Sequence, residues 1–317
     1  MLTHDALLRI GTRTTPMALA RARHVQDLLL KAAPEITTEI VGIPAPDEHR
    51  SRAPAARGAR AVLGEIDRRL LGGQVDLAVL NMADIPGDVP LPAGVTFGAY
   101  LPREDVRDVL VFRSGSPLRT LADAPPGTVI GTSSVRRTAQ LLRHRPDLRV
   151  RRVRGGPDPA DRLSLLDEDS GYEALVLPRT ALEHGSMAGR RAELLVLDVM
   201  CPPVGAGVTG VQCRVRDTGI ADLLYGIDDS TTRTHIAAER TLLHGLRGHG
   251  GSPIAGHCRT LPDGRLSLRG MVFTRDGRHV IEVCERDDPD RPTRLGTRVS
   301  AALLRRGARA VIDGVPR

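Results

Sequence analysis

Residues 128–144, TVIGTSSVRRTAQLLRH, change from an apolar strand pattern to a helix pattern within a few positions. The pattern predicts a strand over 128–132 and a helix over 133–144, with Ser133 or Ser134 as the capping residue. Strands that alternate with helices are typical of mostly parallel sheets with helices on both faces. The stretch therefore predicts an α/β fold with a polar helix start at the carboxyl end of a strand, where such sheets bind their ligands.

The alternation continues on both sides of this stretch. Further strands are expected over 7–11, 36–43, 75–80, 109–113, 148–154 and 174–177, and helices over 15–32, over 59–71 and from about 161. Residues 44–58 combine Pro, Ala and charge without periodicity, which indicates a loop. Beyond about residue 219, the pattern predicts a helix over 231–246, strands over 254–261, 265–273 and 278–285, and a helix over 291–306. This order predicts a separate α+β domain with an antiparallel sheet.

Composition excludes several classes of protein. The 317 residues are 41% hydrophobic, and 45 basic residues against 38 acidic ones give a formal net charge of +7. Lys31 is the only lysine, so the basic excess is arginine, whose guanidinium group binds carboxylates and phosphates bidentately. The absence of Trp and the scarcity of Tyr and Phe argue against an aromatic platform for single-stranded nucleic acid. The four cysteines show no Cys-x-x-Cys spacing, which argues against a zinc site or a disulfide framework.

Location and partners are also constrained. No apolar run approaches the ~18–20 residues of a membrane span. The first residues, Met1-Leu-Thr-His-Asp5, lack a basic region followed by an apolar one, so export is not expected. We therefore expect a cytoplasmic protein that acts on a small anionic molecule, without a nucleic acid or a membrane as partner. No apolar stripe demands a second copy of the chain, so a monomer is expected.

Arg136 and Arg137 stand in the first turn of the helix expected over 133–144. The free N–H groups of a helix start, the helix dipole and two guanidinium groups would together form a cradle for an anion. Arginine in a first helical turn is locally unfavourable unless an anion is present. The competing interpretation is an ordinary Ser-capped helix whose arginines are solvated.

A second basic cluster follows the same helix. It comprises Arg149, Arg151, Arg152, Arg154 and Arg162. Alternation places Arg152 and Arg154 on one face of the expected strand, and Arg154 at its carboxyl end, before Gly155, is the better candidate ligand. Arg149 and Arg151 are expected to be solvated on an edge strand. A nucleic-acid patch is the competing use of such a run.

Asp84 follows the strand expected over 75–80. In a turn, an aspartate commonly bonds nearby backbone N–H groups, and without further context this interpretation is favoured. At the carboxyl end of a strand that faces arginines, the same carboxylate can act as a general acid or base, or it can stabilise a developing cation.

Taken together and in order, these segments resemble the hydroxymethylbilane synthase family, also called porphobilinogen deaminase, over nearly the whole chain. The motifs are LRIGTRTTPMAL (8–19), VDLAVLNMADIP (75–86), GTSSVRR (131–137) and PVGAGVTGVQCR (203–214). The resemblance implies two α/β domains similar to periplasmic binding proteins and a C-terminal α+β domain with a three-stranded antiparallel sheet. It implies domain 1 over 1–101 plus 203–219, domain 2 over 102–202 and domain 3 over 220–317.

The resemblance also implies an activity and a site in the cleft between the first two domains. The family's enzyme releases ammonia from the aminomethyl group of porphobilinogen, and another pyrrole attacks the azafulvene cation that results. Asp84 matches the family's catalytic aspartate. The residues expected to bind the substrate are Arg13, Thr15, Ser133, Ser134, Arg136, Arg137, Arg154, Gly155 and Arg162.

The sequence departs from the family where the dipyrromethane primer is attached. The family holds this primer through a thioether to a cysteine of the third domain, and Gly250 stands at that position, just before Pro253-Ile254. Cys258 lies beyond these residues and is expected in the core. Other replaced positions are Ala59, Gly64, Leu80, Asn81, Ala83, Gly156 and Ala206. No covalent dipyrromethane is therefore expected, and the group can be present only if it is held noncovalently or at an unexpected residue.

Three interpretations follow from this mixture of retained and lost residues. The chain is a working enzyme that anchors its primer differently, a paralogue that couples fewer pyrroles or another nucleophile, or a noncatalytic protein whose cleft binds an anionic small molecule. The retained groups bind carboxylates and stabilise a cation, whereas the lost ones hold the primer, which favours the paralogue. Asp84 argues against the binding protein, because a carboxylate among arginines weakens anion binding.

Overall fold

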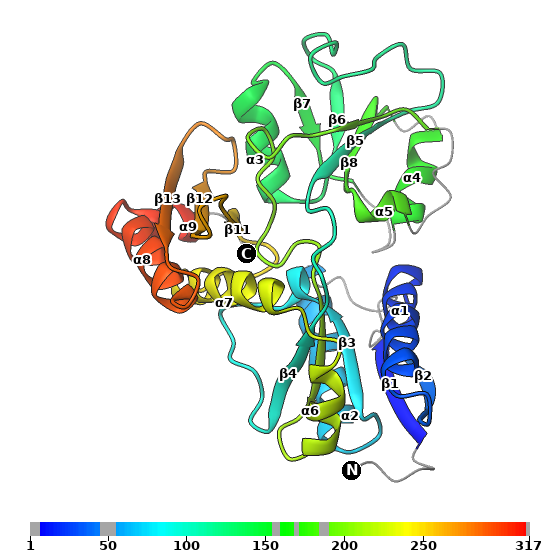
Figure 1. The fold of residues 1–317 in the computed structure, drawn as a ribbon. Helices are drawn as coiled ribbons and strands as arrows, with labels where there is room; N and C mark the ends of the chain where they lie inside the picture. Colours follow the sequence, from blue (N-terminus) through cyan, green and yellow to red (C-terminus); the bar gives the residue numbers. More distant parts are fainter. Residues whose placement is uncertain (1–6, 45–54, 154–158, 168–170, 184–189, 315–317) are drawn as a thin grey trace.

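The computed structural model describes residues 7–44, 55–153, 159–167, 171–183 and 190–314. Two α/β lobes lie one above the other, and a C-terminal unit of strands and helices lies beside their junction (Figure 1). Each of these three bodies contains one of the sheets found in the described residues. The sheets fall in the three segments expected from the sequence, and the exact domain boundaries stay predictions.

The first lobe is built on a sheet of order β2-β1-β3-β10-β4. Its strands are β1 (Leu7–Arg13), β2 (Thr37–Ile43), β3 (Leu77–Asn81), β4 (Val95–Tyr100) and β10 (Thr209–Arg214), and its helices are α1 (Pro16–Ala32), α2 (Ala55–Leu71) and α6 (Thr218–Tyr225). β1 runs parallel to β2 and β3, whereas β10 is antiparallel to its neighbours. The late strand β10 therefore returns the chain into the middle of a sheet made by its first hundred residues.

Strand β3 shows how this sheet is buried on both faces. Leu77 and Val79 pack in one core cluster with the α1 residues Val25 and Leu29. Ala78 and Leu80 pack in the other, with Val62, Ile66 and Leu70 of α2. Successive side chains of a strand point to opposite faces, so helices on both sides require an apolar run without polar alternation. That run is what the sequence shows over this strand.

The second lobe repeats the arrangement with a sheet of order β7-β6-β8-β5-β9. Its strands are β5 (Asp108–Phe112), β6 (Val129–Gly131), β7 (Arg149–Arg151), β8 (Ala174–Pro178) and β9 (Ala192–Leu194), and its helices are α3 (Val135–His144), α4 (Pro159–Asp167) and α5 (Thr180–Glu183). β6 is parallel to β7 and β8, and β5 is antiparallel to β8 and β9. Each sheet is therefore mostly parallel in direction, as expected, with one reversed strand that the sequence did not predict, β10 in the first lobe and β5 in the second.

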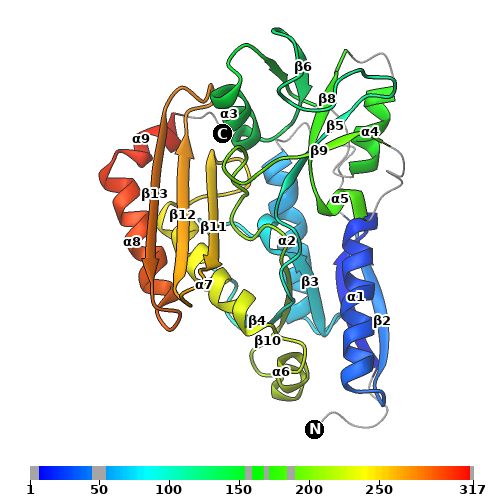
Figure 2. The same cartoon turned by 45° about the horizontal axis from the view of Figure 1, so that its top comes forward.

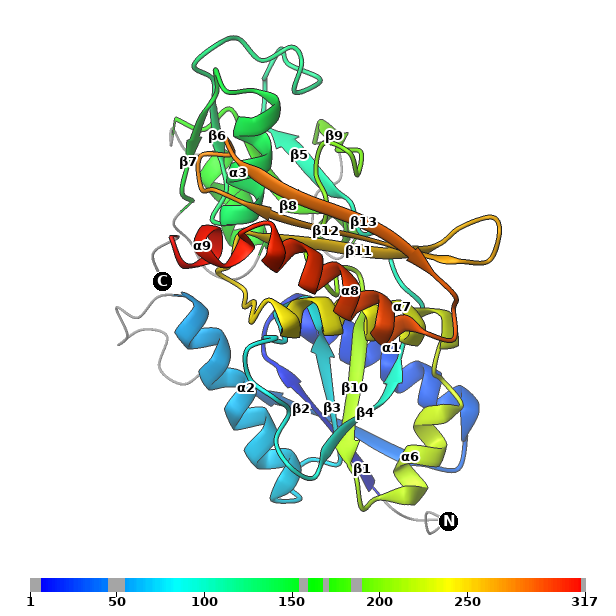
Figure 3. The ribbon, with the colours of Figure 1, turned by 90° about the vertical axis from the view of Figure 1, so that its left-hand side faces the viewer.

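The C-terminal unit is a three-stranded antiparallel sheet of β11 (Ile254–Thr260), β12 (Leu266–Phe273) and β13 (Val280–Asp287). Its helices are α7 (Ser230–Gly245), α8 (Pro292–Arg305) and α9 (Ala308–Asp313). The three strands lie side by side in Figure 2, and α7 lies between this sheet and the first lobe in Figure 3. The predicted fold class, α/β lobes followed by an α+β domain with this sheet, is confirmed. Within the described residues no helix is both long enough and apolar enough to cross a membrane.

Glu239 of α7 joins the C-terminal unit to the two crossovers between the lobes. Its carboxylate is fully buried and accepts two hydrogen bonds of 2.8 Å from Arg103, one of 2.8 Å from the Gly205 N–H and one of 2.7 Å from the Cys258 N–H. Burial alone would raise the pKa of Glu239, but Arg103 and His257 outweigh it and hold the pKa at about 2. One ionised carboxylate therefore fixes both connecting segments to the third sheet.

Helix α2 carries an acidic residue without a charged partner, and this gives a pH-dependent stability. Burial raises the pKa of Asp67 from 3.8 to about 6, because no described residue pairs with its carboxylate. The folded protein thus holds this proton more tightly than the unfolded chain, and stability falls as the pH rises from about 4 through 6. We expect Asp67→Asn to raise the free energy of unfolding by about 1 kcal/mol at pH 8 and to change little at pH 4. Thermal unfolding followed by circular dichroism at both pH values tests this, and equal shifts at both would contradict it.

Candidate active site

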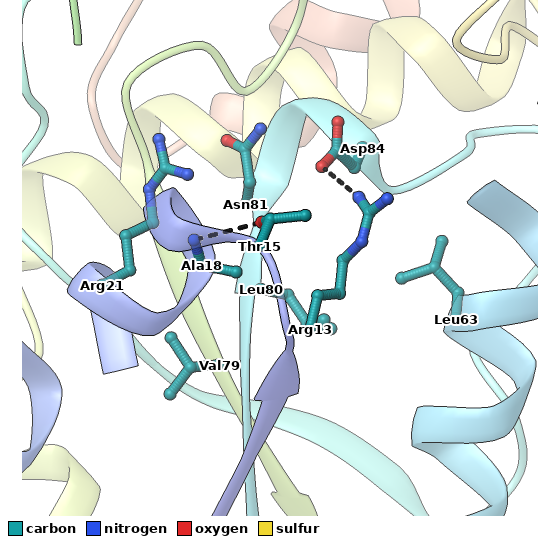
Figure 4. Close-up of a pocket in the computed structure, with 9 residues that line it drawn as sticks. All are labelled: Arg13, Thr15, Ala18, Arg21, Leu63, Val79, Leu80, Asn81 and Asp84. Atoms are coloured by element: carbon teal, nitrogen blue, oxygen red, sulfur yellow. Dashed lines mark hydrogen bonds and ion pairs between the residues drawn. The ribbon is translucent and has the colours of Figure 1, made fainter. Parts of the chain in front are cut away.

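A pocket lies where β1 and β3 end and α1 begins (Figure 4). The cavity itself is small, about 50 Å³, and it opens to solvent. Its lining residues are Arg13, Thr15, Ala18, Arg21, Leu63, Val79, Leu80, Asn81 and Asp84. Ligands of open α/β sheets bind at such carboxyl ends of strands. Three residues predicted from the sequence, Arg13, Thr15 and Asp84, meet here.

Local hydrogen bonds fix the position of the first two. The hydroxyl of buried Thr12 donates to the carbonyl of Val79 at 3.0 Å, which holds the end of β1 against β3. Thr15 then caps α1, accepting a hydrogen bond of 3.4 Å from the Ala18 N–H, and Pro16 begins the helix. Proline is favoured at this first position, where its missing N–H leaves no bond unmade. The turn between strand and helix therefore presents Arg13 and Thr15 to the pocket.

Asp84 reaches the pocket from β3, the parallel neighbour of β1. β3 ends at Asn81, and a single turn of 3₁₀ helix, η1 (Met82–Asp84), brings the aspartate to the rim. Its Oδ2 lies 3.3 Å from Nη1 of Arg13 (Figure 4), and its side chain is 43% exposed. The carboxylate is thus oriented by one guanidinium group and stays accessible to a ligand, as a group that stabilises a cation must be.

The C-terminal unit holds the segment that follows Asp84. Arg240 of α7 donates to the carbonyls of Ile85 and Pro86 at 2.6 and 2.8 Å, and the Gly87 N–H donates to the carbonyl of Gly248 at 2.8 Å. The loop after α7, where the family carries its primer, is therefore in direct contact with the loop that follows the predicted catalytic aspartate.

The predicted anion cradle of the second lobe already contains an anion. Asp108 of β5 is buried and accepts hydrogen bonds from Arg136 at 2.7 Å and from Arg137 at 2.7 and 3.1 Å. Burial alone would raise the pKa of Asp108, but the two guanidinium groups outweigh it and keep this pKa below the usual value. Arg136 also donates to the carbonyl of Cys201 at 2.5 Å. The alternative of solvated arginines is therefore wrong.

These contacts bear on each cradle residue differently. Ser134 is the cap of α3, accepting from the Arg137 N–H at 3.4 Å, whereas Ser133 is exposed beside it. Arg136 is 4% exposed, both of its terminal nitrogens bond within the protein, and its contact with a ligand stays a prediction. Arg137 is half-buried, and its contact with a ligand stays a prediction, as do those of the two serines.

The rest of the second basic cluster is only partly described. Arg154 and Gly155 lie outside the described residues. Arg162 is half-buried on α4, next to Leu163 of the core cluster against which Met17 of α1 packs. The start of α1, which lines the pocket, therefore touches the second lobe, and Arg162 belongs to the helix on the other side of that contact.

Gly250 and Cys258 are the residues on which the predicted loss of the attachment cysteine depends. Gly250 lies in an exposed turn, and a Cβ added there would meet no atom within 4 Å, so a cysteine would fit. Cys258 is 1% exposed in the core of the C-terminal unit, and burial raises the pKa of its thiol well above the usual value. The expectation that Cys258 is a core residue is confirmed. Its buried, protonated thiol is a poor nucleophile.

Two further polar residues line the pocket without having been predicted as site residues, Arg21 and Asn81. A signal for Arg21 exists in the helix pattern, because it lies four residues before Val25 on the buried face of α1. Asn81 was noted only as a departure from the family. Arg21 lies two residues after the motif over 8–19, and Asn81 lies within the motif over 75–86.

The fold and the pocket define an α/β protein with a pocket at the carboxyl ends of its strands, lined by one accessible carboxylate and two arginines. A family model described as "Porphobilinogen deaminase, dipyromethane cofactor binding domain" matches residues 8–222, and one described as "Porphobilinogen deaminase, C-terminal domain" matches residues 234–305. The chain belongs to the porphobilinogen deaminase family.

Individual relatives match over nearly the full length. "Porphobilinogen deaminase 2" of Streptomyces coelicolor is 41% identical over 310 residues, which cover 98% of this chain and 97% of the relative. "Porphobilinogen deaminase" of Gloeobacter violaceus is 36% identical over 309 residues, which cover 96% and 93%. Among solved structures, the periplasmic aliphatic sulphonate binding protein SsuA from Escherichia coli is similar over 76% of this chain and 69% of its own, with 18% identity and a TM-score of 0.39.

Proposed function

We propose that this protein is a transferase of the hydroxymethylbilane synthase type, which releases ammonia from an aminomethylpyrrole carboxylate and joins the resulting carbon to a nucleophile. The observation that carries the proposal is the accessible carboxylate of Asp84, 3.3 Å from Arg13 in a pocket at the strand ends. The relatives' name, porphobilinogen deaminase, supports the same reaction class.

The chemistry needs a carboxylate in this position. The bond between the methylene carbon and the protonated amine breaks, ammonia leaves with the electron pair, and a positive charge spreads over the methylene carbon and the pyrrole ring. Asp84 would stabilise this charge and accept a hydrogen bond from the pyrrole N–H. A nucleophilic carbon then attacks the methylene carbon, and the proton on that carbon is released. Arginines at the pocket would bind the carboxylate arms of the substrate.

We further propose that the protein holds no covalently attached dipyrromethane. The family model names this group, and arginine-lined pockets suit its carboxylates, so noncovalent binding fits the residues present. A thioether requires a thiolate, and the described loop between α7 and β11 offers none: Gly250 stands at the family position and Cys258 is buried. The retained chemistry and the lost anchor together support a paralogue of the primer-bearing enzymes.

Incubation of the purified protein with porphobilinogen, followed by mass analysis of protein and products, tests both proposals. We expect release of ammonia, a pyrrole condensation product, and an intact protein mass equal to that of the sequence. A mass excess of two linked pyrroles would overturn the noncovalent proposal, and no ammonia release would overturn the function. Gly250→Cys is the matched variant, because the turn is open: we expect this variant alone to gain the two-pyrrole mass.

We also propose that the protein is a monomer, that its partner is a small molecule and that it binds no nucleic acid. Many of the described arginines pair with acidic residues of the same chain, as Arg9 and Arg214 do with Asp76, so fewer of them are available to a polyanion than the arginine count suggests. The noncatalytic alternative predicts tight binding of porphobilinogen without ammonia release, so the same incubation separates it from the enzyme.

A further inference from the structure

Three arginines of the described residues are buried, and one of them differs from the other two. Arg136 pairs with Asp108 at 2.7 Å, and Arg214 pairs with Asp217 at 2.5 Å and with Asp76 at 3.0 Å. Arg21 is only 9% exposed, yet its Nε has no hydrogen-bond partner, and no described residue forms an ion pair with it. A buried charge normally has a partner, because an unpaired one costs several kcal/mol.

The position of Arg21 explains what its partner would be. It stands in the second turn of α1 and lines the same pocket as Arg13, Asn81 and Asp84. Figure 4 shows its guanidinium group on one side of Asn81 and the ion pair between Arg13 and Asp84 on the other. All four polar heads point to the same side of the pocket.

The charges of the pocket are unbalanced in one direction. Asp84 is paired with Arg13, so the second guanidinium group, that of Arg21, has no counter-charge among the lining residues. A guanidinium group presents a planar fork of donors that matches a carboxylate, and charge-assisted bonds of this kind are the strongest in proteins. The pocket therefore lacks one carboxylate on the side of α1.

We propose that Arg21 binds a carboxylate arm of the substrate and determines the preference of this pocket for an acidic pyrrole. This inference rests on the proposed function for the identity of the substrate, and on the unpaired buried guanidinium group for the presence of the site. Arg13 orients Asp84, and Arg21 holds the substrate so that its aminomethyl carbon lies near that carboxylate.

Equilibrium binding measures the contact directly. In the Asp84→Asn background, which prevents turnover, titration calorimetry with porphobilinogen compares Arg21→Gln with Arg23→Gln. Arg23 is the matched control, because it lies on the exposed face of the same helix. We expect Arg21→Gln to raise Kd by about 10-fold to 100-fold and Arg23→Gln to leave it unchanged. The dimethyl ester of porphobilinogen should bind equally to the parent and the Arg21→Gln variant.

Stability of the ligand-free protein separates a binding role from a structural one. An unpaired buried charge destabilises the free protein, so Arg21→Gln should leave its Tm unchanged or raise it, and should reduce the rise in Tm that porphobilinogen causes. A structural arginine would give the opposite result, a lower Tm in the absence of ligand. That result would overturn the proposal.

The outcomes distinguish this proposal from the proposed function. Turnover of porphobilinogen with unchanged Kd and KM in Arg21→Gln would overturn the role of Arg21 and leave the function intact. If the wild-type protein does not act on porphobilinogen but binds glutarate, and Arg21→Gln abolishes this binding, the function is overturned and the carboxylate site is supported. Binding of neither molecule would overturn both.

Discussion

Replacing Asp84 by asparagine should lower kcat for ammonia release from porphobilinogen by about 10³-fold or more, while Kd changes by less than about 3-fold. Asparagine keeps the shape of the side chain and removes its charge. In the proposed function the substrate's carboxylate arms contact arginines, so their binding does not need Asp84, whereas the cation that forms in the reaction loses the only accessible counter-charge in the pocket lining. A coupled assay for ammonia gives kcat, and titration calorimetry gives Kd.

Asp88→Asn is the control for this experiment. Asp88 lies four residues further along the same loop and pairs with Arg60 of α2, outside the lining of the pocket. We expect its turnover to stay within about 2-fold of the wild type, because only a surface ion pair is lost. Full turnover in Asp84→Asn would remove this aspartate from the mechanism.

Replacing Asp108 by asparagine should destabilise the second lobe by about 3–5 kcal/mol, because two guanidinium groups would be left with a neutral partner in the interior. Arg136 and Arg137 both bond to this carboxylate, and Arg136 is itself buried. Urea unfolding followed by far-ultraviolet circular dichroism measures the change, since the protein has no Trp to report by fluorescence.

A neighbouring carboxylate provides the comparison. Asp105 pairs with Arg107 only two residues away and is more exposed, so Asp105→Asn should cost about 1 kcal/mol or less. The pKa of Asp108 is lowered in the folded state, so its contribution is present above the unfolded value near 3.8 and is lost as the pH falls through the folded value. Wild-type protein should lose this part of its stability on acidification, and Asp108→Asn should not. Equal stability of the two aspartate variants would contradict the internal role.

Local sequence patterns predicted most helices and strands of the fold, because the formation of each of these elements depends mainly on residues that are close in the chain. The helix expected over 15–32 is α1, and the strands expected over 254–261 and 265–273 are β11 and β12, within a residue at their ends. Where long-range contacts decide, the pattern failed. No strand was predicted over 95–100, yet β4 forms there because β10 pairs with it from more than a hundred residues away.

The candidate site shows the same division. The motif at 131–137 predicted a cradle for the anion of a ligand at this helix start, and that ligand contact stays a prediction. Asp108 pairs with Arg136 from a strand 28 residues away, a pairing that only the fold creates. For Arg21 the helix spacing places the side chain on the buried face of α1, which the sequence shows. That this buried group has no partner is shown only by the folded structure.

The contacts of Arg240 and Gly248 with residues 85–87 have a consequence for how such a protein can diverge. In a primer-bearing relative, the third domain supplies an anchor. Here the same domain also holds the loop after Asp84 by hydrogen bonds, and these bonds do not depend on a cysteine. Loss of the attachment residue, as we propose for this protein, would therefore leave the third domain necessary, because the segment after Asp84 would still need its contacts.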